Sequence, residues 1–111
     1  MGVSDAGSVR GVPRVRVEVL YFEGCPHWQT TADRLTALQA EMGFELRRQP
    51  VATLEEAERL GFRGSPTIRV NGVDPFAPDD APIGFACRIY ETPAGPAGSP
   101  TIEQLRKVIP R

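Results

Sequence analysis

The sequence predicts an α/β fold: a four-stranded mixed sheet with helices on both faces. Three observations predict it. An alternating strand pattern opens the ordered part of the chain, an amphipathic helical pattern follows it at once, and two further strand–helix units come later. The predicted order is strand, helix, strand, helix, strand, strand, helix. The first strand–helix–strand unit should be right-handed with parallel strands.

The first predicted strand covers residues 14–22, where Val15, Val17 and Val19 alternate with charged residues. A helix is then expected from Pro26, a residue suited to the first helical position, to Met42, because Gly43 can end it. Residues 44–51 form the second predicted strand, which arginines and a proline place at a sheet edge.

Residues 54–60 form a short second helix, since Thr53 and Glu56 have capping-box spacing. The third strand is expected at residues 67–70. It is followed by the tight-turn pair Asn71-Gly72, a long ordered loop over residues 73–84, and a fourth strand at 85–90. After a Pro/Gly-rich connector, a last helix is expected over residues 101–109, with Ser99 as its cap.

Composition limits the classes of function. Residues 1–13 lack hydrophobic periodicity and are expected to be a disordered tail, which leaves residues 14–111 as a single domain. Thirteen basic and 14 acidic residues give a net charge of −1, which argues against nucleic acid as a partner. No apolar run approaches the roughly 20 residues of a membrane span, so we expect no membrane association and a cytoplasmic monomer.

The segment 21–28 is the most informative for chemistry, because it places Cys25 where a strand leads into the amino end of a helix. Unpaired N–H groups and the positive end of a helix dipole favour a thiolate over a thiol. His27 would add to this effect if it were protonated and close, and Glu23 would oppose it. The pattern therefore predicts a reactive thiol at the start of the helix.

The element order, the sequence Gly24-Cys25-Pro26-His27-Trp28 and the later Ser65-Pro66-Thr67 resemble the thioredoxin-like superfamily over residues 14–111. In that family the first cysteine of a C-x-x-C motif attacks disulfides, and a cis-proline lies beside it. The resemblance implies that Cys25 is the attacking thiol, and that Ser65 and a cis Pro66 position the partner chain.

The motif departs from the family at its fourth position, where Trp28 replaces the second cysteine. Three roles for Cys87 therefore stay open. Cys87 can approach Cys25 and act as a distant resolving thiol, or it can be an inert buried residue while an external thiol resolves Cys25. It can also join Cys25 in capturing a soft metal ion, which needs only two thiolates.

Other candidate residues have simpler interpretations. Trp28 is expected in the core or at the rim of the thiol, and His27 in solvent. Cys25, His27 and Cys87 fall short of the four ligands of a structural zinc site, so no metal and no cofactor is expected. The acidic residues of the long loop do not have calcium-loop spacing and are expected to solvate it; they are Asp74, Asp79 and Asp80.

The leading hypothesis is a thiol-disulfide exchange protein that acts on a thiol- or disulfide-bearing protein or a small thiol. Its catalytic residues would be Cys25 and Cys87, and the substrate-binding residues would be Pro26, His27, Trp28, Ser65, Pro66 and Thr67. One alternative is a non-catalytic binding module that only retains the fold. A weaker alternative is the handling of soft metals or organomercurials.

Overall fold

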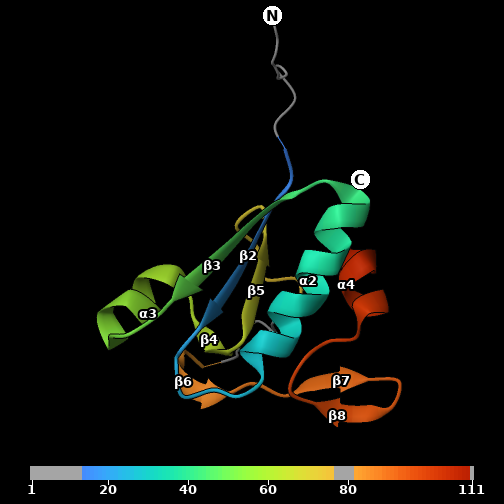
Figure 1. The fold of residues 1–111 in the computed structure, drawn as a ribbon. Coiled ribbons are helices and arrows are strands. Elements are labelled where there is room, and N and C mark those ends of the chain that lie inside the picture. The colour runs from blue at the N-terminus through green and yellow to red at the C-terminus, as the bar shows by residue number, and fades with distance from the viewer. Residues whose placement is uncertain (1–13, 77–81, 111) are drawn as a thin grey trace, which may run out of the picture.

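The computed structural model describes residues 14–76 and 82–110. Its central sheet has the strand order β3-β2-β5. Strand β2 (Arg16–Tyr21) pairs in parallel with β3 (Glu45–Pro50) and antiparallel with β5 (Thr67–Val70). The predicted α/β class and the parallel first strand–helix–strand unit are therefore confirmed (Figure 1).

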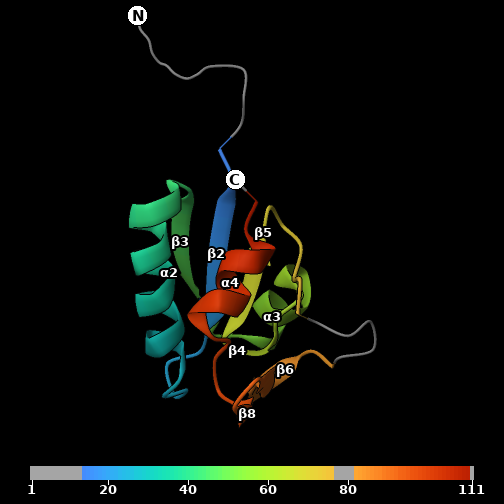
Figure 2. The same cartoon turned by 90° about the vertical axis from the view of Figure 1, so that its right-hand side faces the viewer.

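Helices lie on both faces of this sheet, as Figures 1 and 2 show. Helices α2 (Trp28–Met42) and α4 (Ile102–Val108) lie on one face, and α3 (Leu54–Leu60) lies on the other. Alternation along β2 explains this arrangement, because Val17 and Val19 enter one buried cluster with residues of α2 and α4, whereas Leu20 enters a second cluster with Ala57 of α3.

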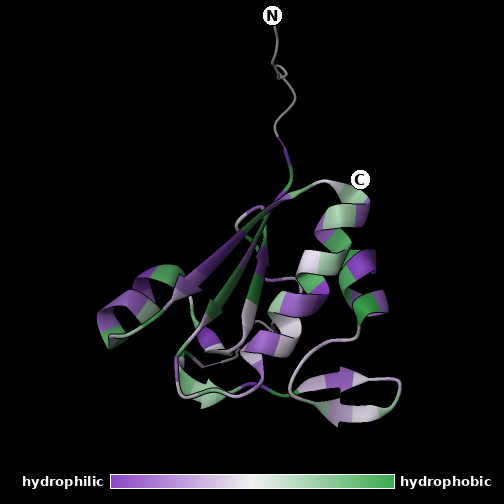
Figure 3. Cartoon of the chain, viewed as in Figure 1, coloured by the Kyte–Doolittle hydropathy of each residue, from purple (hydrophilic) through white to green (hydrophobic). Residues whose placement is uncertain are grey.

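Strand β3 is an edge strand of the described sheet and carries charged and polar residues along its length. Figure 3 shows it as predominantly hydrophilic, in contrast to the buried apolar residues of β2. Arginines and a proline are tolerated there because one side of an edge strand needs no ladder partner. The predicted edge position of residues 44–51 is confirmed.

The predicted fourth strand, residues 85–90, does not join the described central sheet. This segment divides into β6 (Gly84–Cys87), which pairs in parallel with β4 (Arg63–Ser65), and β7 (Tyr90–Thr92), which forms a hairpin with β8 (Gly95–Ala97). The described central sheet therefore has three strands. The physical reason is the break at Arg88, whose backbone N–H bonds the Ser65 carbonyl before the chain turns away.

Two helix starts also differ from prediction. Helix α2 begins at Trp28 with His27 as its N-cap, because residues 22–25 form a turn in which the Cys25 N–H bonds the Phe22 carbonyl. Pro26 therefore precedes the cap. Helix α4 is capped by Thr101, whose side chain forms a capping box with Gln104. The predicted capping box of α3 is confirmed.

Ser99, the expected cap of the last helix, has a different role. Its hydroxyl lies 2.6 Å from the hydroxyl of Thr31 on α2, and both residues are buried. This bond joins the chain after β8 to the first turn of α2. None of the three helices within residues 14–76 and 82–110 has the length and hydropathy that crossing a membrane requires.

Candidate functional site

The two cysteines lie side by side, although 62 positions separate them in the sequence. The Cys87 thiol donates a hydrogen bond to the Cys25 sulfur, with 3.8 Å between the two Sγ atoms. Both are free thiols. Of the interpretations that the sequence left open for Cys87, that of a buried residue is wrong, because Cys87 is exposed.

Strand pairing brings Cys87 to this position. In the parallel pair β4–β6, Cys87 lies opposite Ser65. The ring of Phe85 packs against Phe22, 6.0 Å away between centroids, and against Phe62, 5.8 Å away. Since Phe22 belongs to the turn that carries Cys25, this aromatic contact fixes β6 beside that turn.

The exposures of the two sulfur-bearing residues are opposite. Cys25 is only 2% exposed, and its thiol donates to the Ser65 carbonyl at 3.4 Å. Cys87 is exposed to solvent. The sequence predicted a reactive Cys25 thiol at the start of the helix, whereas the structure buries Cys25 and leaves neighbouring Cys87 exposed. Cys87 is therefore the more accessible of the two cysteines from solvent.

The pKa of the Cys87 thiol is raised. The main cause is its hydrogen bond to Cys25, which favours the protonated form of the donor, and desolvation and the charge of Cys25 act in the same direction. Because the donor is the exposed sulfur and the acceptor is the buried one, the two thiols are chemically distinct.

The segment around Pro66 is buried rather than open to a partner chain. The Ser65–Pro66 peptide bond is cis, as the resemblance implied. Ser65, Pro66 and Thr67 are all buried. The Ser65 carbonyl accepts from both the Cys25 thiol and the Arg88 N–H, so it is not available to pair with an extended peptide.

Thr67 holds the turn that carries Ser65 and Pro66. Its hydroxyl donates to the Gly64 carbonyl and accepts from the Arg63 N–H at 3.2 Å. Thr67 was predicted to bind substrate; in the structure its side chain is buried and bonds the backbone of this turn. The same turn is fixed from the other side by Tyr90, which is 4% exposed and donates its hydroxyl proton to the Pro66 carbonyl.

The prediction that the loop aspartates interact only with solvent is wrong for Asp74. Its carboxylate forms a bidentate ion pair with Arg88, and both side chains are largely buried. Arg88 directly follows Cys87 in the sequence. The Arg88 guanidinium also lies 4.7 Å from the centroid of the Tyr90 ring. Asp79 and Asp80 lie outside the described residues.

Sequence reasoning missed Tyr90, Arg88 and the role of Asp74. The one local signal was the arginine directly after Cys87. Its ion pair with Asp74 joins residues 14 positions apart, and no short motif predicts such a pair. Burial raises the pKa of Tyr90 above its usual range, so this hydroxyl stays protonated and keeps its bond to Pro66.

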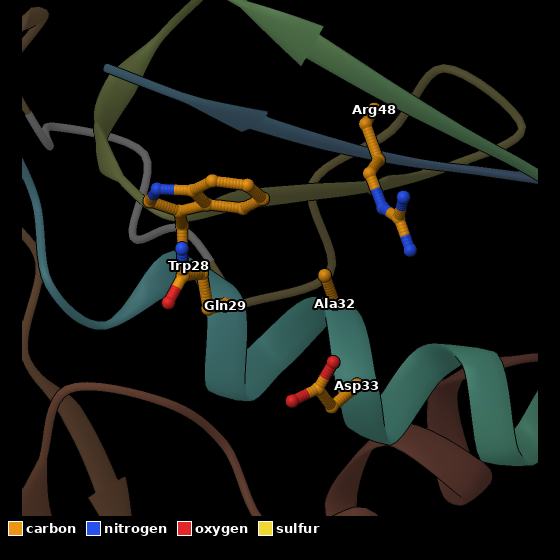
Figure 4. A pocket seen from close by; sticks show the side chains of 5 residues that line it. All are labelled: Trp28, Gln29, Ala32, Asp33 and Arg48. Atoms are coloured by element: carbon orange, nitrogen blue, oxygen red, sulfur yellow. The ribbon is translucent and has the colours of Figure 1, made fainter. Parts of the chain in front are cut away.

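The remaining predicted site residues lie around the turn that carries Cys25. Pro26 and His27 are exposed, which confirms the solvent position predicted for His27. The imidazole of His27 lies against Gly98. Trp28 is stacked on Tyr21, with ring centroids 3.9 Å apart. Figure 4 shows the indole beside a pocket that Asp33 of α2 and Arg48 of β3 also line.

The described residues contain no group of three or more His, Cys, Asp or Glu side chains placed to hold a metal ion together. Comparison of the chain with protein-family models, curated proteins and solved structures finds no match. The two cysteines and the residues around them are therefore the features of this chain that bear on its function.

Proposed function

We propose that this chain is a thiol-disulfide exchange protein of thioredoxin-like fold, in which Cys25 and Cys87 form a reversible disulfide. The observation that carries the proposal is the 3.8 Å separation of the two Sγ atoms. A disulfide needs about 2.05 Å between the sulfurs, so each sulfur has to move by only about 1 Å. Side-chain rotation supplies a movement of this size.

The exposures of the two cysteines assign them different steps. The thiolate of exposed Cys87 attacks a partner disulfide, the partner S–S bond breaks, and its other sulfur leaves as a thiolate, which gives a mixed disulfide. Buried Cys25 then attacks the Cys87 sulfur, the bond to the partner breaks, and the partner leaves as a thiolate that takes a proton from water. Cys25 is already close to the roughly 3–3.5 Å separation of a reactive conformer. Cys25 thus replaces the second cysteine of a C-x-x-C motif as the internal thiol, although Trp28 stands at that motif position.

The thioredoxin-like assignment is supported by the sheet order β3-β2-β5 with an antiparallel third strand, by helices on both faces, and by the cis peptide before that strand. It is also consistent with Cys25 lying in the turn between β2 and α2. The chain departs from the family pattern at β6, which pairs with β4 instead of joining the sheet.

The test is a thiol titration after mild oxidation of the full chain. We expect both thiols to disappear while the protein remains monomeric, and to return when a dithiol reductant is added. The controls are Cys25→Ser and Cys87→Ser, each of which should retain its single thiol or form intermolecular disulfides. Two thiols that persist in the oxidised wild-type chain would refute the proposal and favour a binding module, whose function survives in Cys25→Ser.

A second candidate function, capture of a soft metal ion, is favoured by the same proximity of the two sulfurs. Thiolates select soft ions such as Cu(I), and a linear two-thiolate site needs no third protein ligand. Titration of the reduced chain with Hg(II) tests this capture. Protection of both thiols at one equivalent supports capture, whereas thiols that stay reactive towards alkylation exclude it.

A further inference from the structure

The cavity beside Cys87 is the most specific feature that the proposed function leaves unexplained. It has a volume of about 300 Å³, and Cys87 itself forms part of its wall. The other walls come from β4, from β6 and from the residues just before β6. Small-molecule sites start at about this volume, so the cavity fits one small organic group.

The walls of this cavity are mostly small or apolar, and Arg63 and Arg88 are the two charged residues among them. Gly64, Gly84 and Ala86 leave the space open, and Ile83 contributes an aliphatic side that is 40% exposed. Arg88 also lines the cavity, but its guanidinium is held by Asp74 at 2.6 Å. Arg88 therefore presents mainly its methylene groups to an occupant.

The position of the cavity relative to the sulfurs restricts what can fill it. Buried Cys25 leaves little room for a molecule whose sulfur bonds Cys87, whereas the cavity has Cys87 itself in its wall. An apolar group attached to that sulfur leaves water on entering the cavity, and burial of each CH₂ contributes about 0.8 kcal/mol. A strongly hydrated group gains nothing from the apolar part of these walls.

We propose that the exchange partner is a low-molecular-weight thiol with an apolar group, which bonds Cys87 and places that group in the cavity beside it. This inference rests on the proposed Cys25–Cys87 couple. In the oxidised chain, the thiolate of the partner attacks the Cys87 sulfur, the Cys25–Cys87 bond breaks, and Cys25 leaves with the electron pair as a thiolate.

A second molecule of the thiol completes the exchange. Its thiolate attacks the partner sulfur of the mixed disulfide, the bond to Cys87 breaks, and Cys87 leaves as a thiolate that takes a proton from water. The net change converts two thiols into one small disulfide and reduces the Cys25–Cys87 disulfide to two thiols. All electrons that the protein receives come from the small thiol.

The first experiment compares benzyl mercaptan with 2-mercaptoethanol, two alkyl thiols of similar acidity, as reductants of the oxidised full chain. Each rate is divided by the rate of the same thiol with oxidised glutathione, which removes intrinsic reactivity. We expect the normalised rate of benzyl mercaptan to be about tenfold higher, since 1.4 kcal/mol of apolar burial corresponds to a factor of ten. Equal normalised rates would overturn the inference.

The Gly84→Val variant tests the cavity directly. Gly84 lines the cavity, and a Cβ added there would meet no atom within 4 Å, so the position has open space for an added side chain. The normalised preference for benzyl mercaptan over 2-mercaptoethanol should fall towards one. The matched control is Ala40→Leu, an exposed position on α2, which should keep the preference. A preference that survives in Gly84→Val would overturn the inference.

The attacked sulfur is identified by quenching the reaction with iodoacetamide and mapping the peptides. We expect the benzyl group on Cys87 and the alkyl label on Cys25, and a benzyl group on Cys25 would overturn the inference. Failure of this inference can be told apart from failure of the proposed function. If no Cys25–Cys87 disulfide forms, both proposals fail, whereas a disulfide without preference for the apolar thiol removes only this one.

Discussion

Asp74 and Arg88 form a largely buried bidentate ion pair beside the exposed thiol, with a shortest N–O distance of 2.6 Å and side-chain exposures of 11% and 9%. The Arg88 backbone N–H bonds the Ser65 carbonyl, the same oxygen that accepts from Cys25. The ion pair therefore holds Arg88 against Ser65, whose carbonyl also contacts Cys25.

Asp74→Asn should destabilise the fold, because it leaves the Arg88 cation buried without its counter-charge. We expect a loss of about 2–3 kcal/mol in the free energy of unfolding, measured by urea denaturation of the reduced chain. Glu41→Gln is the matched control, since it removes one carboxylate from an ion pair with Arg106 that is far more exposed, and it should cost under about 1 kcal/mol. Equal losses in the two variants would contradict the anchoring role.

The pKa of Cys87 gives a prediction whose sign is fixed by its cause. The hydrogen bond to Cys25 raises this pKa, so at a given mildly alkaline pH fewer Cys87 thiols are ionised than without that bond. Cys25→Ala removes both the acceptor and its charge and should lower the pKa of Cys87. Alkylation of Cys87 by iodoacetamide should therefore become faster at pH 8, and its pH profile should shift to lower pH.

The profile of Cys25→Ala is best compared with that of Phe76→Leu, which changes the packing against Tyr90 without touching either sulfur. That variant should keep the wild-type profile of Cys87. An unchanged profile in Cys25→Ala would show that the two thiols do not interact in solution.

Oxidation should stabilise the fold if the two cysteines pair. The closed loop spans 62 positions, and the chain-entropy model assigns a loop of this length roughly 4 kcal/mol, an upper value because native strain reduces it. We expect the melting temperature of the oxidised chain to rise by about 10 °C or more relative to the reduced chain. Cys87→Ser should melt at the same temperature with and without oxidant, and an oxidised wild-type chain that melts no higher would speak against the pair.

Local patterns predicted much of the fold but little of the site. Alternation in residues 14–22 and the Thr53–Glu56 capping box are properties of neighbouring residues, and the structure confirms both. Which strand residues 85–90 pair with depends instead on a long-range contact, the pairing of Cys87 on β6 with Ser65 on β4. No periodicity within six residues encodes which strand they join.

The same limit explains the site. The sequence marked Cys25 because its turn has a local signature, and it left the role of Cys87 open because sulfur proximity depends on tertiary packing. It assigned Asp74 to solvent for the same reason, since its partner Arg88 lies 14 positions away. Burial of Cys25 likewise follows from the packing of β6 and could not be read from its own segment.

Gly64 controls how closely β4 and β6 approach each other. Its φ of +101° lies in the region that favours glycine, and a Cβ there would stand 3.1 Å from the Ala86 carbonyl oxygen and 3.2 Å from the Cβ of Arg88. Gly64→Ala therefore adds crowding against β6 to the backbone strain. Since β6 carries Cys87, the crowding should move the two sulfurs apart and slow formation of the Cys25–Cys87 disulfide.

Gly72→Ala separates the two effects, because Gly72 has a φ of +85° but a Cβ added there would meet no atom within 4 Å. Strain alone should cost each variant about 1–2 kcal/mol in the free energy of unfolding. Only Gly64→Ala should also slow disulfide formation, followed as the rate of thiol loss under a fixed oxidant concentration. Equal rates in the two variants would mean that the close approach of β4 and β6 does not set the distance between the sulfurs.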